Sequence, residues 1–157
     1  MWGQSPLPEF SIVIPVFNEA LGIKDALSHL QPLRSEGVEV VVVDGGSTDN
    51  TVIDIAGLCN QVINAPKGRA CQMNAGAQAC KGRYIVFLHA DTRFPSGISI
   101  SDFNLCLPGS AVWSFCRLRL SGAQWPLRVI ERFINWRSRL TGIGTGDQTF
   151  IVDRETF

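Results

Sequence analysis

The sequence predicts an α/β fold in which a mostly parallel sheet is flanked by helices, and three observations support this. Short apolar segments rich in β-branched residues are separated by segments with helical periodicity. The apolar segments do not alternate cleanly with polar residues, which is typical of strands covered on both faces. Repetition of strand and helix along the chain indicates parallel strands joined by right-handed crossovers.

Four strands are expected in the first half, at residues 11–17, 38–43, 61–64 and 84–88. Helical spacing of apolar residues predicts three intervening helices. The first follows Asn18 and should stop at Pro32, and the second follows capping candidates at residues 47–49. The third, between Arg69 and Cys80, has a narrow stripe of mostly small side chains, so we expect it to lie close to the sheet.

The second half has weaker signals. Residues 94–109 contain two prolines and two glycines and are expected to form a helix or a loop insertion. Strands are expected at 112–120 and 149–152, with a helix at 126–140 between them. Asp153 resembles a helix cap, and the chain stops at Phe157 where that helix would begin. We therefore expect a truncated chain.

The expected helix at 126–140 is amphipathic. Its apolar residues are Val129, Ile130, Phe133, Trp136 and Leu140, and its opposite face carries Arg128, Arg132, Asn135 and Arg139. The arginine face has two interpretations. It is simply solvated, or the helix is interfacial and contacts anionic lipid or a phosphorylated substrate, which would be a peripheral membrane contact.

Composition excludes several classes of function. The 157 residues carry 14 Lys and Arg against 14 Asp and Glu, so no basic surface for nucleic acid is expected. No apolar segment approaches the roughly 20 residues that span a bilayer, and the amino terminus does not resemble a signal peptide. The five cysteines, never spaced C-x-x-C, fit reduced, mostly buried thiols in a cytoplasmic protein.

Polar residues follow three of the expected strands. Glu19 comes after the first strand, Asp44 after the second, and His89 and Asp91 after the fourth. Because ligands of open parallel sheets bind beyond the carboxyl ends of the strands, these side chains should share one edge. An acidic edge suits a hydroxyl-rich or cationic ligand, or a divalent ion that bridges to phosphate.

Each polar motif also has a simpler structural interpretation. The segment Asp44-Gly45-Gly46-Ser47 could contact a ribose or a base, or could be only a strand-to-helix turn. His89 and Asp91 are two residues apart, so on an extended segment they would point the same way and could hold one divalent cation, or they could simply face water. Both alternatives remain open for each motif.

A further candidate is an anion site. Lys67 and Arg69 open the third helix, where free backbone N–H groups favour phosphate, although a solvated basic loop is the alternative. His29 lies within the first helix and is expected to be structural. No G-x-G-x-x-G follows the first strand, and there is neither a P-loop nor a G-x-S-x-G segment, which disfavours those sites.

Three segments together resemble a known family. They are SIVIPVFNEA, VVVDGGSTDNT and APKGRACQMNAGAQACKGRYIVFLHADT. In order and spacing they resemble the nucleotide-sugar half of the GT-A fold, and more narrowly the large second family of inverting glycosyltransferases. The resemblance divides the single domain, residues 1–157, into a nucleotide-sugar-binding half at 1–95 and a partial acceptor-side half at 96–157. FLHADT with GDQ further resembles a bacterial subgroup associated with arsenosugar biosynthesis.

The resemblance implies roles for individual residues. Those that would bind the donor nucleotide are Pro15, Phe17, Glu19, Asp44, Lys67 and Arg69. Asp91 matches the last position of the family's D-x-D element, which binds a divalent metal and the donor diphosphate. His89 occupies the first position, and this departure favours Mn²⁺ over Mg²⁺ because imidazole is a poor Mg²⁺ ligand. Arg93 could supply part of the missing positive charge.

The implied reaction is transfer of a sugar from a UDP- or GDP-linked donor to an acceptor hydroxyl, with inversion. It requires stabilisation of the departing diphosphate and a carboxylate base opposite it. In the family that base usually lies in a Glu-Asp pair beyond the end of this chain, and Asp147 is the remaining candidate. The alternatives are a non-catalytic donor-binding fragment and a sugar-phosphate nucleotidyltransferase, although PVFNEA replaces the glycine-rich signature expected of the latter.

Overall fold

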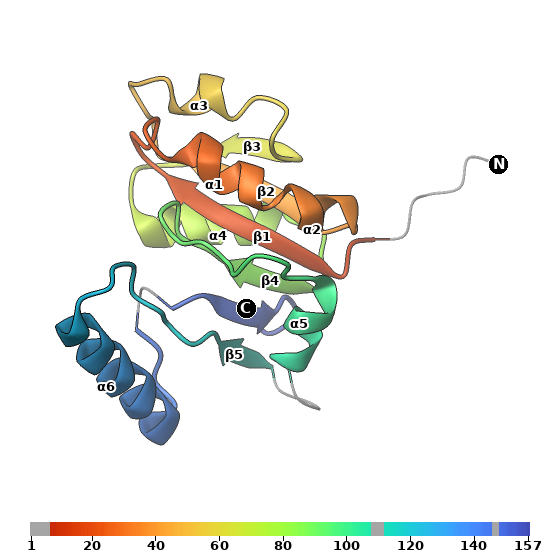
Figure 1. Ribbon diagram of the computed structural model, residues 1–157. Coiled ribbons are helices and arrows are strands. Elements are labelled where there is room, and N and C mark those ends of the chain that lie inside the picture. Colours follow the sequence, from red (N-terminus) through yellow and green to blue (C-terminus); the bar gives the residue numbers. More distant parts are fainter. Residues whose placement is uncertain (1–6, 108–111, 146–147) are drawn as a thin grey trace.

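The computed structural model describes residues 7–107, 112–145 and 148–157. Within these residues six strands form one sheet in the order β3-β2-β1-β4-β6-β5 (Figure 1). The strands are β1 (Phe10–Val16), β2 (Glu39–Asp44), β3 (Gln61–Asn64), β4 (Tyr84–Phe87), β5 (Trp113–Phe115) and β6 (Phe150–Asp153). Strands β1 to β4 are parallel, and β6 runs antiparallel to both β4 and β5. This mostly parallel sheet confirms the predicted fold class.

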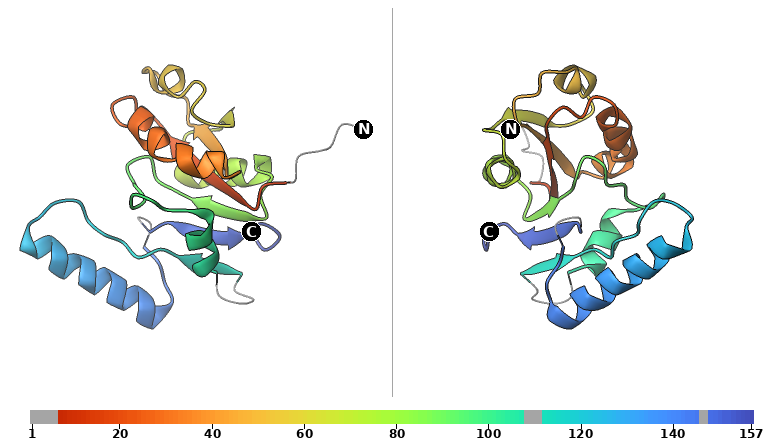
Figure 2. Two further views of the ribbon diagram at one scale, coloured as in Figure 1. Left: turned by 45° about the vertical axis from the view of Figure 1, so that its right-hand side comes forward. Right: turned by 90° about the vertical axis from the view of Figure 1, so that its left-hand side faces the viewer.

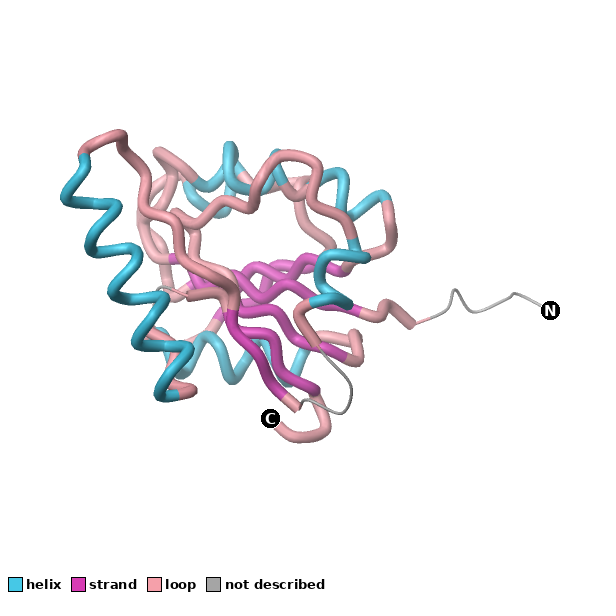
Figure 3. The backbone as a smooth tube through the Cα atoms, turned by 60° about the horizontal axis from the view of Figure 1, so that its bottom comes forward, coloured by secondary structure: helices cyan, strands magenta, loops and turns pink. Residues whose placement is uncertain are grey.

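Helices lie on both faces of the sheet (Figure 3). They are α1 (Ile23–His29), α2 (Gln31–Ser35), α3 (Thr51–Asp54), α4 (Arg69–Ala79), α5 (Ile100–Leu105) and α6 (Trp125–Thr141). Helices α1, α2 and α5 contribute to a core on one face, and α4 packs on the other. Both faces of the central strands are therefore covered, which explains why their sequences do not alternate between apolar and polar residues.

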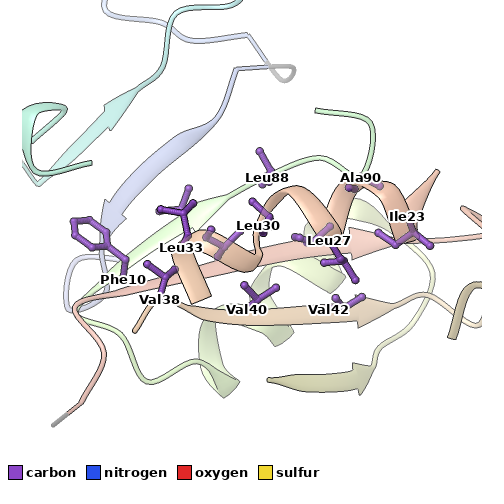
Figure 4. Close-up of a cluster of buried hydrophobic side chains, with 14 of the residues drawn as sticks. Phe10, Ile23, Leu27, Leu30, Leu33, Val38, Val40, Val42, Leu88 and Ala90 are labelled. Carbon is purple, nitrogen blue, oxygen red and sulfur yellow. The ribbon is translucent and has the colours of Figure 1, made fainter. Parts of the chain in front are cut away.

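The larger core fills the space between α1, α2 and the sheet. Figure 4 shows Ile23, Leu27 and Leu30 above Val40 and Val42. These five side chains are at most 2% exposed. On the opposite face Val13, Val41 and Val43 pack with Ala77 of α4.

Helix α4 lies very close to the sheet, as its stripe of small residues predicts. At Gly76 an added Cβ atom would lie 2.2 Å from Cγ1 of Val13 and 3.0 Å from Cγ2 of Val43. No side chain larger than hydrogen fits there without displacing Val13 or the helix. Gly76 thus lets the helix that begins at Arg69 approach the sheet between β1 and β2.

Several element boundaries differ from expectation. Pro32 does not end helical structure, because it lies in the first turn of α2, where its missing N–H is not needed. The helix after residues 47–49 is a single turn, and its N-cap is Asn50. Asp153 ends β6 instead of capping a helix, and its Oδ1 atom accepts a hydrogen bond from the Glu155 N–H.

Helix α6 is turned opposite to the usual amphipathic arrangement. The side that carries Asn135 and Ser138 packs inward: Asn135 is buried and pairs with the backbone N–H and C=O of Leu118, and buried Ser138 donates to Gln148. Arg132 and Arg139, which the sequence places with Asn135 on the polar face, are exposed instead. The apolar residues are exposed as well. The strand expected at 112–120 is shorter than predicted, because β5 ends at Phe115 and Leu118 pairs with the Asn135 side chain instead of a strand. None of the helices in the described residues is long and apolar enough to cross a bilayer.

Candidate functional site

The ends of three neighbouring strands define the candidate site. Strands β2, β1 and β4 are adjacent and parallel, and Val16 lies opposite Asp44 where β1 and β2 end. The segments that follow these strands therefore leave the same edge of the sheet, which we call the carboxyl edge. Glu19, Asp44, His89 and Asp91 all belong to these strand ends or to the segments that follow them.

Two loops at this edge are joined by hydrogen bonds. The backbone N–H of Asn18 donates to Oγ of Ser47 at 2.9 Å, and its side-chain oxygen accepts from the Thr48 N–H at 2.8 Å. The Glu19 N–H donates to Oγ1 of Thr51 at 2.8 Å. Asn18 adopts a φ of 55°, a left-handed conformation that asparagine tolerates better than most residues. The loop after β1 is thereby fixed to the loop after β2, and the Glu19 side chain remains exposed.

Asp44 has a clear structural role. Its carboxylate is buried and accepts hydrogen bonds from the Gly46 N–H, the Ser47 N–H and the Ser47 hydroxyl at 2.5–3.1 Å. The geometry therefore agrees with the turn interpretation of Asp44-Gly45-Gly46-Ser47. Gly46 has a φ of 87°, which this turn requires and which favours glycine. Contact of Asp44 with a ligand remains a prediction.

Asp49 takes part in the same loop junction. It accepts hydrogen bonds from the Thr51 hydroxyl, the Thr51 N–H and the Ala20 N–H. The Thr51 hydroxyl is the main reason that the pKa of this carboxyl is lowered, and the backbone donors add to it. The charged form of Asp49 therefore helps to hold the two loops together.

The basic residues of the edge surround the start of α4. The Lys67 ammonium lies 3.8 Å from the centroid of the Phe17 ring, a cation–π contact between two predicted donor-binding residues. Arg69 is the first residue of α4. One turn further on, the buried Gln72 donates from Nε2 to the carbonyls of Val16 and Val43, at 2.8 Å each. Sequence reasoning missed Gln72, which ties α4 to the ends of β1 and β2.

A cavity of about 120 Å³ opens at the carboxyl edge. It brings together three of the predicted site residues, Pro15, Arg69 and His89. The other residues that line it were not predicted, and they are Met73, Phe87, Leu88, Gln148 and Phe150. The lining does not include Phe17, Glu19, Asp44, Lys67 or Asp91. The structure thus divides the predicted residues between this cavity and the loops around it.

His89 and Asp91 do not share the face of an extended strand. Strand β4 ends at Phe87, and the chain turns at residues 90–91, with the Thr92 N–H donating to the His89 carbonyl at 3.0 Å. His89 borders the cavity, whereas Asp91 is exposed. Alternation along a strand therefore cannot align their side chains. In the described residues, no group of three or more His, Cys, Asp and Glu side chains could hold a metal ion.

Arg93 stabilises this turn. Its guanidinium donates to the carbonyls of Ala90, Thr92 and Gly22, and it forms an ion pair with Asp25 at 3.3 Å. The expectation that Arg93 supplies positive charge to a ligand receives no support from this geometry, because its donors hold the loop after β4 against the start of α1.

Gln148 joins the second half of the chain to the cavity. It is buried, and its side-chain oxygen accepts hydrogen bonds from the Ser138 hydroxyl and from the N–H and hydroxyl of Thr145, while Nε2 donates to the Cys116 carbonyl. Gln148 is the last residue of the sequence segment GDQ, in which the sequence predicts a functional role for the aspartate and not for the glutamine. Asp147 lies outside the described residues.

The cysteines are less buried than expected from the sequence, because Cys80 is buried, Cys59, Cys106 and Cys116 are half-buried and Cys71 is exposed. All five are free thiols. Burial raises the pKa of the Cys116 thiol to about 12, with Cys106 adding to the effect, and burial likewise raises the pKa of Cys59 and Cys80. Thiols with raised pKa values remain protonated and are poor nucleophiles and metal ligands.

The fold and the edge define an α/β protein with a candidate ligand site beyond the carboxyl ends of its parallel strands. Residues 11–102 match the model of the Glycosyl transferase family 2. This match covers more than half of the chain, and the chain belongs to that family.

Relatives of this chain are named as glycosyltransferases or as a mannosyltransferase. An uncharacterized glycosyltransferase from Haemophilus influenzae is 25% identical over 166 residues, which cover 96% of this chain and 64% of that protein. A dolichol-phosphate mannosyltransferase from Saccharomyces cerevisiae is 28% identical over 98 residues, 55% of this chain and 37% of that protein. A PGL/p-HBAD biosynthesis glycosyltransferase from Mycobacterium bovis is 36% identical over 92 residues, 54% of this chain and 36% of that protein. The chain thus spans less than two thirds of each of these relatives.

Solved structures show the same fold. A mannosyltransferase from Pyrobaculum calidifontis in complex with GDP-Man and Mn²⁺ has a TM-score of 0.72 at 21% identity, over 95% of this chain and 45% of that one. Glucosyl-3-phosphoglycerate synthase from Mycobacterium tuberculosis, in complex with Mn²⁺, UDP and glucosyl-3-phosphoglycerate, has a TM-score of 0.65 at 20% identity, over 96% and 58%. The similarity confirms the GT-A fold expected from the sequence.

Proposed function

We propose that the protein is an inverting glycosyltransferase of the hexosyltransferase type, which transfers a sugar from a UDP- or GDP-linked donor to an acceptor hydroxyl. The observation that carries this proposal is the cavity at the carboxyl edge, where Pro15, Arg69 and His89 meet in a chain of this family. Solved structures of the same fold contain GDP-Man or UDP.

We expect the charged side chains of the carboxyl edge to determine how the donor lies along it. Lys67 and Arg69 are the cations at the start of α4, where the first backbone N–H groups of the helix also favour a diphosphate. Phe17, beside Lys67, offers an aromatic surface for the base, and Asp44 and Glu19 offer carboxylates for base or ribose. Lys67 and Arg69 would stabilise the departing diphosphate. We assign this as the main catalytic contribution of the nucleotide-sugar-binding half.

A divalent cation is proposed here from the family element that Asp91 matches at its last position. Asp91 has an exposed carboxylate in a turn held by Arg93, and His89 borders the cavity two residues before it. We propose that these two residues would hold Mn²⁺ or Mg²⁺ only together with oxygens of the donor diphosphate. The described residues contain no group of three or more protein ligands that could hold the ion without the donor. Bound there, the ion would neutralise charge on the departing diphosphate. The imidazole favours Mn²⁺.

The acceptor half includes Gln148 and the segment around it. Gln148 fixes Thr145 and α6 relative to the cavity. We propose Asp147, next to it in the sequence, as the base that takes the proton of the acceptor hydroxyl. The arsenosugar subgroup and the cytoplasmic location also remain proposals, the first supported by FLHADT with GDQ and the second by the five free thiols.

Thermal unfolding with UDP or GDP, each with and without Mn²⁺, tests donor binding. A ligand that binds only the folded state raises the melting temperature. We expect UDP or GDP to raise it further when Mn²⁺ is present, and Asp91→Asn to remove the effect of the metal. Equal melting temperatures with and without every nucleotide would contradict the proposal. Release of UDP or GDP from a nucleotide sugar then distinguishes an active transferase from a donor-binding fragment.

A further inference from the structure

Helix α6 exposes its apolar face. Trp125, Phe133, Trp136 and Leu140 are 76%, 62%, 60% and 67% exposed, and Val129 and Ile130 are also exposed. We call these six residues the apolar face of α6. Large side chains gathered on one exposed face usually mark an interaction surface.

The orientation of the helix is fixed from its other side. The Asn135 side chain exchanges two hydrogen bonds with the backbone of Leu118, and Ser138 donates to the buried Gln148. Arg128 donates to the carbonyls of Leu120 and Gly122 and forms an ion pair with Glu131 at 2.7 Å. Rotation of α6 to bury its apolar face would break the hydrogen bonds to Leu118, Leu120, Gly122 and Gln148, whereas the Arg128–Glu131 pair lies within the helix.

The helix also carries a concentrated positive charge. It contains four arginines and one glutamate, whereas the whole chain is neutral. Arg132 and Arg139 are exposed, and at 100° per residue they lie together along one border of the apolar face. Tryptophan and phenylalanine on one face with arginine beside them are typical of helices that lie in the interface of an anionic bilayer.

The charge pattern disfavours a second copy as the occupant. If two α6 helices packed face to face in antiparallel orientation, Arg132 and Arg139 would lie near the same arginines of the other copy. The one carboxylate of the helix, on Glu131, already pairs with Arg128. An anionic membrane offers both the apolar interior and the negative charge.

Figures 1 and 2 show α6 at the periphery, on the side of the molecule where β1, β2 and β4 end. No other element of the described residues covers its outer side in these views. The helix can therefore reach a flat surface without any change in the sheet.

We propose that α6 docks the protein on anionic phospholipid membranes, inserting its apolar face among the acyl chains while Arg132 and Arg139 contact the lipid phosphates. This surface lies outside the proposed donor site, so the two proposals can fail separately. The contact is peripheral, because α6 lies in the plane of the bilayer and does not span it.

Co-sedimentation with vesicles tests the proposal. We expect the whole chain to pellet with vesicles of phosphatidylglycerol and phosphatidylcholine, weakly with phosphatidylcholine alone, and less at high salt. Trp136→Glu should lower the partition constant by about tenfold or more, because a large apolar group no longer leaves water. The double variant R132E/R139E should lose the preference for anionic vesicles.

Two control variants test whether a new negative charge elsewhere on the surface also changes vesicle binding. Ile53→Glu places the same charge at a 73% exposed apolar residue on α3, and Lys81→Glu reverses an exposed charge elsewhere. Both should bind vesicles as the unchanged chain does. Equal binding by Trp136→Glu and the unchanged chain, or no binding to anionic vesicles, would overturn the proposal. A dimer in light scattering that Trp136→Glu dissociates, without vesicle binding, would assign the face to a second copy and overturn it as well.

Discussion

The ammonium group of Lys67 lies 3.8 Å above the ring of Phe17, joining the segment before α4 to the segment after β1. Both residues were expected at the donor site from the sequence. Their contact fixes a cation and an aromatic ring side by side at the carboxyl edge. In the proposed function, the ring positions the charge for the donor.

Phe17→Leu should weaken UDP or GDP binding about threefold, because a cation–π contact at an exposed site contributes about 0.5–1 kcal/mol. Leucine keeps an apolar side chain but removes the ring. Titration calorimetry in the presence of Mn²⁺ measures the change. Phe17→Tyr retains the ring and should bind as the unchanged chain does; unchanged affinity in Phe17→Leu would show that the contact has no part in binding.

Asp49 makes the contact between the loop after β1 and the loop after β2 sensitive to acid. Its pKa in the folded protein is below the ordinary 3.8, so its contribution to stability is present above pH 3.8 and is lost as the pH falls through the folded value. Asp49→Asn should therefore be less stable than the unchanged chain at neutral pH, and the difference should shrink below pH 3.8.

Urea unfolding at several pH values measures this difference. Glu155→Gln, at an exposed position, controls for the general loss of a negative charge. A gap between Asp49→Asn and the unchanged chain that stays constant with pH would show that the charge of Asp49 does not stabilise the loops.

Gln72 should be important for stability. Gln72→Leu removes two hydrogen bonds to the carbonyls of Val16 and Val43 at a buried position, and we expect a loss of about 2 kcal/mol in the free energy of unfolding. Gln78→Leu changes an exposed glutamine of the same helix and should stay within about 0.5 kcal/mol. Equal effects of the two substitutions would refute the role of Gln72 as a tie between α4 and the sheet.

The sequence predicted the central sheet well because its signals are local. Runs of β-branched residues such as 38–43 favour strands with two covered faces, and the small residues around Gly76 predict close approach of α4. Placement of Glu19, Asp44 and Asp91 near one edge follows from the parallel connections alone. These features need no knowledge of distant contacts.

The remaining features depend on contacts between distant segments. The Asn135 side chain is buried where it pairs with the backbone N–H and C=O of Leu118, and the periodicity of α6 alone does not predict this contact. The chain turns after β4, so Asp91 does not lie on a continuation of the extended strand. The alternation of side chains along a strand does not predict this turn. Gln72 and Gln148 carry no charge and belong to no catalytic pattern, yet each connects several backbone groups.

The central claim is that the carboxyl edge binds the diphosphate and metal of a nucleotide sugar. Nuclear magnetic resonance of amide groups, with UDP or GDP and a trace of Mn²⁺, tests it most directly, because the paramagnetic ion broadens the signals of nearby residues. We predict strong broadening at residues 44–48, 67–69 and 89–92, and sharp signals at the opposite edge, near Glu9, Val38 and Arg83. Broadening centred on that opposite edge, or none that depends on the nucleotide, would contradict the account.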